Sequence, residues 1–199
     1  MSKINVFHMH LTDDDSIPII FSNYPEMINY AAFSSQEVYT HDQLKDLVSY
    51  AEKNGIKIIP EFDVPGHIRA LGDDPNLNHL LTCYDHIEEW KMYDDNYIHG
   101  GPARAVLNPT LNETYELLSN VIKDLKDIFT TADYLHLGGD EVLVKDCWED
   151  NQQVKKYMDE HGISDGDEMF TIFQDKAKDV ARNYSKPIAH WVFQDNFNI

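Results

Sequence analysis

Four short apolar runs, at residues 4–11, 56–64, 134–137 and 188–193, constrain the fold of this 199-residue chain more than any other feature. Each run is nearly continuous in apolar residues rather than alternating with polar ones. That pattern is typical of strands buried on both faces of a parallel sheet. Helical patterns separate the runs, so strand and helix alternate along the chain. The alternation predicts an α/β fold with parallel strands and right-handed crossovers.

The predicted helices carry their own start and stop signals. Thr40 with Gln43, and Thr110 with Glu113, each fit a capping box ahead of an apolar stripe. Gly162 stands where a shorter helix over residues 154–161 should end. These local signals support the order strand, loop, helix.

Two architectures fit this order. A doubly wound open sheet suits the chain length, whereas a closed (β/α)8 barrel takes roughly 250 residues. Four strand–helix units therefore predict either an open sheet or part of a barrel. In both cases the long segments that follow the strands, at residues 12–40, 64–109 and 138–150, lie on the carboxyl side of the sheet, where α/β proteins place their sites.

Charge and hydropathy exclude some partners. The chain has 16 Lys and Arg against 35 Asp and Glu, a formal net charge of −19. A surface this negative repels phosphate backbones and anionic lipid, so we expect no nucleic-acid partner. No apolar run approaches 18 residues, so we expect no insertion into a membrane.

Ionisable and aromatic residues gather where each predicted strand ends. The endings read HMHLTDDD at residues 8–15, PEFDVPGH at 60–67, HLGGDE at 136–141 and HW at 190–191. The carboxyl ends of parallel strands meet at one edge of the sheet, so these side chains should form one cluster. Burying so many charges is costly unless they are paired, which favours a functional site over a purely structural one.

A metal site is one chemistry for this cluster. His8 and His10 lie two apart on a strand, so their side chains share a face, as in metal-dependent hydrolases of barrel type. His67, His136 and nearby aspartates would complete the ligand shell.

Carboxylate chemistry on a sugar is the second. Asp140 and Glu141 place two carboxyls in one pocket, where mutual repulsion would keep one of them protonated as a general acid. Aromatic side chains would supply a stacking platform for a sugar ring. The candidates are Trp191, Tyr84, Trp90 and Trp148.

The cysteines and sequons are weaker signals. Cys83 and Cys147 are either buried thiols or one disulfide of a secreted protein. Asn112 and Asn183 each begin an N-glycosylation triplet, which leans toward the secretory route.

The motifs resemble those of glycoside hydrolase family 20, the β-N-acetylhexosaminidases, and most of all the eukaryotic lysosomal subunits. The resemblance rests on HLGGDEV at residues 136–142, NVFHMHLTDD at 5–14, IPEFDVPGH at 59–67, NPTLNETY at 108–115, CWE at 147–149 and Trp191. These motifs cover essentially the whole chain in the expected order. The resemblance implies a (β/α)8 barrel that removes terminal β-linked N-acetylglucosamine or N-acetylgalactosamine.

The resemblance also implies roles for individual residues. The family retains configuration without a protein nucleophile, because the substrate's acetamido oxygen attacks the anomeric carbon. Glu141 matches the general acid/base, and Asp140 matches the residue that orients the acetamido group. Asp13 and His67 match a supporting relay toward Glu141, and Trp191 matches a wall of the sugar pocket.

Further expectations follow from the same resemblance. No metal and no cofactor is needed, so His8 and His10 become core or supporting residues. Cys83 and Cys147 match a disulfide that ties two active-site loops. The location implied is lysosomal or secreted. The partners implied are N-acetylhexosamine-terminated glycans, with a homo- or heterodimer through the barrel left open.

The chain also departs from the family pattern. Residues 1–199 match about strands two to five of the catalytic barrel. Counterparts of the family's N-terminal α/β domain, first strand and strands six to eight are not found, and Met9 stands where the family often has tryptophan. We therefore expect the activity in the intact parent protein. An inactive or sugar-binding-only fragment, and a metal hydrolase using His8 and His10, are the alternatives.

Overall fold

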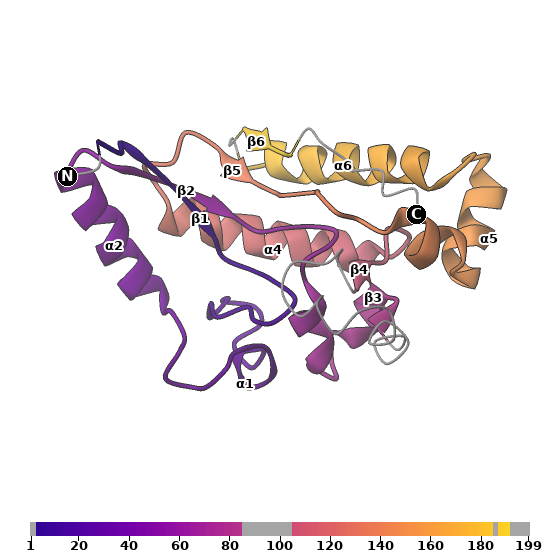
Figure 1. The fold of residues 1–199 in the computed structure, drawn as a ribbon, viewed down its shortest axis with the longest axis horizontal. Helices are drawn as coiled ribbons and strands as arrows, with labels where there is room; N and C mark the ends of the chain where they lie inside the picture. Colours follow the sequence, from indigo (N-terminus) through magenta and orange to yellow (C-terminus); the bar gives the residue numbers. More distant parts are fainter. Residues whose placement is uncertain (1–2, 85–104, 185–186, 192–199) are drawn as a thin grey trace.

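The computed structural model describes residues 3–84, 105–184 and 187–191. Its main sheet has four parallel strands in the order β1-β2-β5-β6 (Figure 1). This order follows the sequence without a reversal, whereas a doubly wound sheet reverses its strand order at a switch point. The α/β prediction is confirmed, the open-sheet alternative is wrong, and the four strands are successive strands of a barrel. They are β1 (Val6–His10), β2 (Lys57–Glu61), β5 (Leu135–His136) and β6 (Ile188–Ala189).

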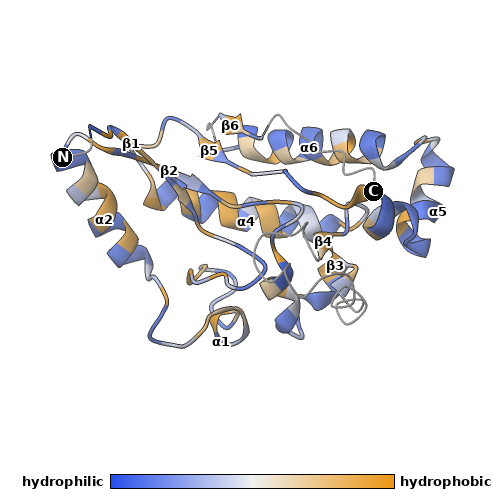
Figure 2. Ribbon diagram, viewed as in Figure 1, coloured by the Kyte–Doolittle hydropathy of each residue, from blue (hydrophilic) through white to orange (hydrophobic). Residues whose placement is uncertain are grey.

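The long helices connect these strands and pack beside one another. Helix α2 (His41–Lys53) contacts β2 and α4 (Asn112–Ile128), and α4 contacts β5 and α6 (Gly166–Arg182). Each helix turns an apolar stripe toward the core and a polar face outward, which Figure 2 shows as alternating colours along the coils. The helices therefore form the outer layer. The side chains that form the candidate site lie on the other face of the sheet, away from this helical layer.

One predicted capping box is confirmed and one is wrong. The Thr40 hydroxyl accepts the backbone N–H of Gln43, and the Gln43 side chain accepts that of Thr40, as the sequence predicted. Helix α4 instead begins at Asn112, and Thr110 is not its cap. The side chain of Asn108 accepts both the backbone N–H and the hydroxyl of Thr110. This local turn removes the hydroxyl that would have capped the helix.

Short elements fill the long loops, and the sequence patterns did not predict most of them. Helix α1 (Ile28–Ala31) lies in the first loop, and α5 (Gln152–His161) ends at Gly162, which takes the expected left-handed conformation. The second loop forms a small antiparallel pair. The elements of the second loop are η1 (Arg69–Asp73), η2 (Asn78–Leu80) and the paired strands β3 (Leu81–Thr82) and β4 (Val106–Leu107). The third loop contains η4 (Lys145–Glu149).

Burial of β1 on both faces was predicted, and it is wrong for this chain. Val6 is 44% exposed and Phe7 is 49% exposed. The reason is that β1 pairs only with β2 in the described part of the sheet, so its other edge and much of its surface meet solvent. Within the described residues, no helix has the length and apolar character required to cross a bilayer.

Candidate functional site

The strand ends bring ionisable side chains into one row across the sheet. In the parallel register, His10 of β1 is opposite Glu61 of β2, and Glu61 is opposite His136 of β5. Residues that pair across a sheet point to the same face, so the three side chains share one face. Trp191 follows the end of β6 and reaches the same row through Glu61. The predicted clustering of the strand ends is confirmed.

A tight turn after β5 presents Asp140 and Glu141. Gly138 and Gly139 both have positive φ, and Glu141 also lies in the left-handed region at φ 52°. A Cβ atom on Gly138 would lie 1.8 Å from Oδ1 of Asp63, so only glycine allows this approach. The same Asp63 oxygen accepts the backbone N–H of Gly139 at 2.9 Å. Strain of this kind in a non-glycine residue is typical of functional sites.

Glu141 contacts a histidine that in turn contacts an aspartate. Nε2 of His67 lies 3.3 Å from Oε2 of Glu141, and Nδ1 of His67 lies 3.6 Å from Oδ1 of Asp13. His67 comes from the loop after β2 and Asp13 from the loop after β1, so three strand ends supply the group. The other Asp13 oxygen lies 3.2 Å from Nε2 of His10. The structure thus brings Glu141, His67 and Asp13 together, with His10 in addition, and ligand atoms of Asp140 and His67 lie within 4.8 Å of each other.

The protonation states follow from these contacts. Burial by itself lowers the pKa of His67, but the hydrogen bond with Asp13 and the surrounding carboxylates raise it to about 9. The hydrogen bonds with Asp13 and Glu61 raise the pKa of His10 to about 10. The same bonds, first with His10 and then with His67, hold the pKa of Asp13 far below its usual range. At neutral pH Asp13 is therefore an anion between two imidazolium cations.

Asp63 and Asp140 lie beside this series of contacting side chains. Asp63 is buried, and desolvation raises its pKa to about 8, with the charge of Asp140 adding to the shift. The backbone N–H of Asp63 donates to the hydroxyl of Thr12. Oδ1 of Asp140 is buried and has no hydrogen-bond partner among the described residues. A buried carboxylate oxygen without a partner can accept a hydrogen bond from a ligand.

These shifts predict a loss of stability at alkaline pH. Groups whose pKa is raised on folding stabilise the protein fully below their unfolded pKa, and that stabilisation disappears as pH rises through the folded value. His67, from 6.5 to about 9, places the loss between pH 6.5 and 9, and Asp63 adds to it up to about pH 8. We expect the free energy of unfolding, measured with urea, to fall by about 3 kcal/mol or more between pH 6.5 and pH 9, because the raised pKa of His67 alone corresponds to that amount. His67→Gln should flatten this dependence, and a stability that rises with pH in this window would contradict the assignment.

Aromatic side chains at the site do not all behave as predicted. Trp191 is 43% exposed, and its ring packs against the rings of His8 and His136 at centroid distances of 5.5 Å and 4.6 Å. Trp148 is wrong as a stacking surface, because it is fully buried and its indole N–H donates to the carbonyl of Leu107. The hydroxyl of Tyr84 donates to Asp73. Trp90 lies outside the described residues.

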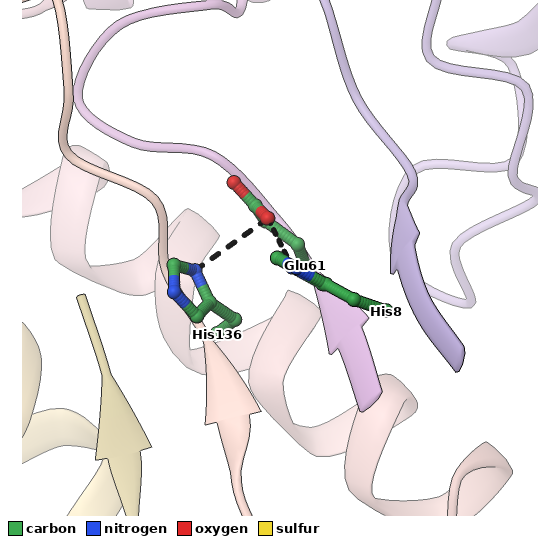
Figure 3. A group of neighbouring side chains, drawn as sticks. All are labelled: His8, Glu61 and His136. Atoms are coloured by element: carbon green, nitrogen blue, oxygen red, sulfur yellow. Dashed lines mark ion pairs between the residues drawn. The ribbon is translucent and has the colours of Figure 1, made fainter. Parts of the chain in front are cut away.

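Four groups of described residues could hold a metal ion, and the one with two histidines is His8, Glu61 and His136. Their ligand atoms lie within 4.8 Å of one another. Figure 3 shows the three side chains. However, Nδ1 of His136 accepts the backbone N–H of Gly138 at 3.0 Å. Burial lowers the pKa of His136, which agrees with a neutral ring whose Nδ1 lone pair is already used. A metal would have to displace this hydrogen bond, so the donor set fits a cation poorly. His190, beside Trp191, is half-buried, and desolvation lowers its pKa to about 4.

The predicted disulfide between Cys83 and Cys147 is present, with Cα atoms 5.2 Å apart. Cys83 follows β3, and Cys147 belongs to η4, in the loop after Glu141. The bond therefore joins the second and third loops at the carboxyl edge of the sheet.

Two cavities among the described residues lie away from this cluster. One of about 220 Å³ is lined by residues such as Ile20, Pro25 and His41, and one of about 160 Å³ lies between Asn23 and Leu77. Neither is lined by Asp140, Glu141 or Trp191.

Glu61 and Asp63 lie in the motif at residues 59–67, but the sequence predicted no role for either of them. The signal that marks them is their place at the end of a buried strand, directly before the loop that carries His67. The structure makes Glu61 the centre of the row and Asp63 the support of the turn at Gly138 and Gly139.

Known proteins match this chain over almost its whole length. The sequence model described as glycosyl hydrolase family 20, catalytic domain, matches residues 1–196. The chain is 34% identical to the human protein named beta-hexosaminidase subunit beta over 198 residues, which is 98% of this chain and 33% of that protein. The chain thus spans about a third of the length of this curated relative.

Solved structures show the same fold. A beta-N-acetylhexosaminidase crystal structure matches with a TM-score of 0.80 and 26% identity, over 96% of this chain and 40% of that one. An exo beta-N-acetylglucosaminidase from Vibrio harveyi, in complex with N-acetylglucosamine, matches with a TM-score of 0.72 and 27% identity. It covers 94% of this chain and 30% of the bacterial chain.

Proposed function

Because this chain belongs to glycosyl hydrolase family 20, we propose that the intact protein hydrolyses terminal, non-reducing β-linked N-acetylhexosamine from glycoconjugates. The observation that carries the proposal is the group formed by Asp140, Glu141 and His67 at the carboxyl edge of the sheet. The relatives named as hexosaminidases, and the bacterial structure that holds N-acetylglucosamine, support this substrate class.

The proposed reaction retains configuration and uses the substrate's own acetamido group as the nucleophile. The acetamido oxygen attacks the anomeric carbon while the bond to the leaving oxygen breaks, and Glu141 transfers its proton to that oxygen. The cyclic oxazolinium ion then reacts with water, and Glu141 takes a proton from the water. No protein side chain becomes bonded to the sugar.

Asp140 is proposed to orient the acetamido group. Its buried oxygen can accept the N–H of the group and stabilise the positive charge that develops there. A positioned carboxylate of this kind acts on the transition state more strongly than on the substrate, because the charge appears only as the ring forms.

His67 and Asp13 are proposed to support Glu141. The imidazolium of His67, 3.3 Å from Glu141, stabilises the carboxylate that remains after Glu141 has given up its proton. Asp13 holds the ring of His67 in place and balances its charge. Trp191, which is partly exposed beside this group, is proposed as a wall that packs against the sugar.

A chelator separates this proposal from the metal alternative. We expect dialysis against EDTA to leave hexosaminidase turnover unchanged, and elemental analysis to find no stoichiometric zinc, since no step proposed here uses a cofactor. A protein treated with added zinc and dialysed again is the control. Activity that disappears with the chelator and returns with zinc would instead support His8 and His10 as ligands.

The cellular setting remains part of the proposal. A lysosomal or secreted location agrees with the disulfide and with the human relative. The side chains of Asn112 and Asn183 are exposed, so both are open to glycosylation. Residues 1–199 are proposed to form part of a catalytic barrel, and a dimer through that barrel stays a prediction.

Release of an aryl alcohol from its β-N-acetylglucosaminide tests the function directly. We expect turnover by the intact protein, and NMR of the first product formed should show the β-anomer, because the mechanism retains configuration. The matching N-acetylgalactosaminide measures the preference between the two sugars. Binding without turnover would support the sugar-binding-only alternative, and initial release of the α-anomer would contradict the mechanism.

A further inference from the structure

Glu61 is a buried carboxylate to which the proposed mechanism gives no role. It ends β2 and is 1% exposed. Burial alone would raise its pKa, yet the hydrogen bond with His10 and the charge of that ring hold the pKa of Glu61 below its usual value. A buried anion persists only where donors surround it.

Three donors, two from β1 and one that follows β6, converge on this carboxylate. The indole N–H of Trp191 donates to Oε1 at 3.1 Å, and Nδ1 of His10 lies 3.4 Å from the same oxygen. Nε2 of His8 contacts the other oxygen, Oε2 (Figure 3). The neutral ring of His136 contributes packing, because it lies against both Trp191 and His8.

A continuous path runs from Glu61 to Glu141. From His10, which contacts Glu61 through Nδ1, Nε2 reaches Asp13 at 3.2 Å. Asp13 then faces His67, and His67 reaches Glu141. Glu61 therefore accepts the indole N–H of Trp191 and also begins the series of alternating acidic and basic side chains that ends at Glu141.

We propose that Glu61 is a positioning residue that fixes the sugar-facing indole of Trp191 and, through His10 and Asp13, the His67 ring that supports Glu141. The inference rests on the proposed function for its effect on turnover, but the contacts themselves do not. It gives Glu61 two separable effects. One acts on sugar binding through Trp191, and the other acts on proton transfer through Asp13.

Glu61→Gln tests both effects, because the amide keeps the shape and removes the charge. In the intact protein we expect KM for the aryl N-acetylglucosaminide to rise and kcat to fall, each by about tenfold. Combined with Trp191→Phe, the substitution should no longer raise KM further. Combined with Asp13→Asn, it should no longer lower kcat further. Effects that simply add in both combinations would overturn the proposal.

The control and the spectroscopic measurement are independent of each other. Asp133→Asn makes the same chemical change in the exposed pair with Lys57 at the other end of β2, and it should leave KM and kcat unchanged.

The indole N–H resonance of Trp191, assigned with Trp191→Phe, should move upfield in Glu61→Gln as the charged acceptor is lost. This readout needs no turnover, so it tests the Glu61–Trp191 contact even if the protein lacks hexosaminidase activity. An unchanged resonance would refute the contact.

Glu61→Asp covers the case in which Glu61→Gln does not fold. It keeps the charge but shortens the side chain, so we expect kcat to recover to near the wild-type value while KM stays raised. A Glu61→Asp protein that loses both equally would show a merely structural role. Loss of activity in Glu61→Gln that zinc restores would make Glu61 a metal ligand and would also overturn the proposal.

Discussion

Glu141→Gln is expected to lower kcat for an aryl N-acetylglucosaminide by at least about 1,000-fold in the intact protein, while KM changes little. The amide keeps the size of the side chain and its approach to His67, but it cannot donate a proton to the leaving oxygen or take one from water. A single general acid or base contributes roughly 100- to 10,000-fold, and here one group performs both transfers. Steady-state kinetics over a range of substrate concentrations measures the two parameters separately.

Glu113→Gln is the matched control for this experiment. Glu113 is an exposed glutamate in the first turn of α4, so the same substitution there should leave kcat and KM as in the wild type. Near-normal turnover of Glu141→Gln would reject Glu141 as the acid/base. Loss of turnover in both variants would point to a general effect of the substitution on the fold.

Removal of the disulfide is expected to produce the largest loss of stability among simple substitutions. The bond between Cys83 and Cys147 closes a loop with a sequence separation of 64. The chain-entropy model gives about 4 kcal/mol for a loop of this length, because the crosslink restricts the unfolded chain. We expect Cys83→Ala with Cys147→Ala to lower the free energy of unfolding by roughly this amount in urea denaturation.

A reductant provides the internal control. Wild-type protein unfolded with dithiothreitol present should approach the stability of the double variant, and the double variant should not respond to the reductant. Equal stability of the oxidised wild type and the double variant would show that the disulfide contributes nothing to the fold. The disulfide also joins the loop that carries Glu141 to the loop after β2, so kcat is expected to fall in the double variant even where the protein remains folded.

Some predictions succeeded because they depend on local sequence, on the order of elements along the chain or on the family resemblance. Thr40 and Gln43 cap α2 as expected, since both halves of a capping box lie within one turn. The strand ends met at one edge because every crossover is parallel, so order along the chain is enough to place them. The disulfide followed from the family resemblance rather than from spacing.

Other predictions failed where a contact outside the sequence pattern decides the outcome. Thr110 has the right neighbours for a cap, but its hydroxyl and its backbone N–H both donate to the side chain of Asn108 instead. Trp148 and Trp191 are the same residue type, and their sequence positions do not reveal that one is buried among α6 aromatics and the other partly exposed. The apolar run of β1 predicted burial on both faces, yet burial of a strand depends on which elements lie beside it.

By itself, the sequence determined the parallel α/β order, the strand ends that carry the chemistry and the family to which the chain belongs. Tertiary structure alone decided the row of His10, Glu61 and His136, because it is set by the register between strands that lie far apart in the chain. It also decided the protonation of His67 and Asp63, because a pKa depends on burial and on charges contributed by other loops. Periodicity is a property of each segment, whereas the electrostatics of the site belong to the contacts between segments.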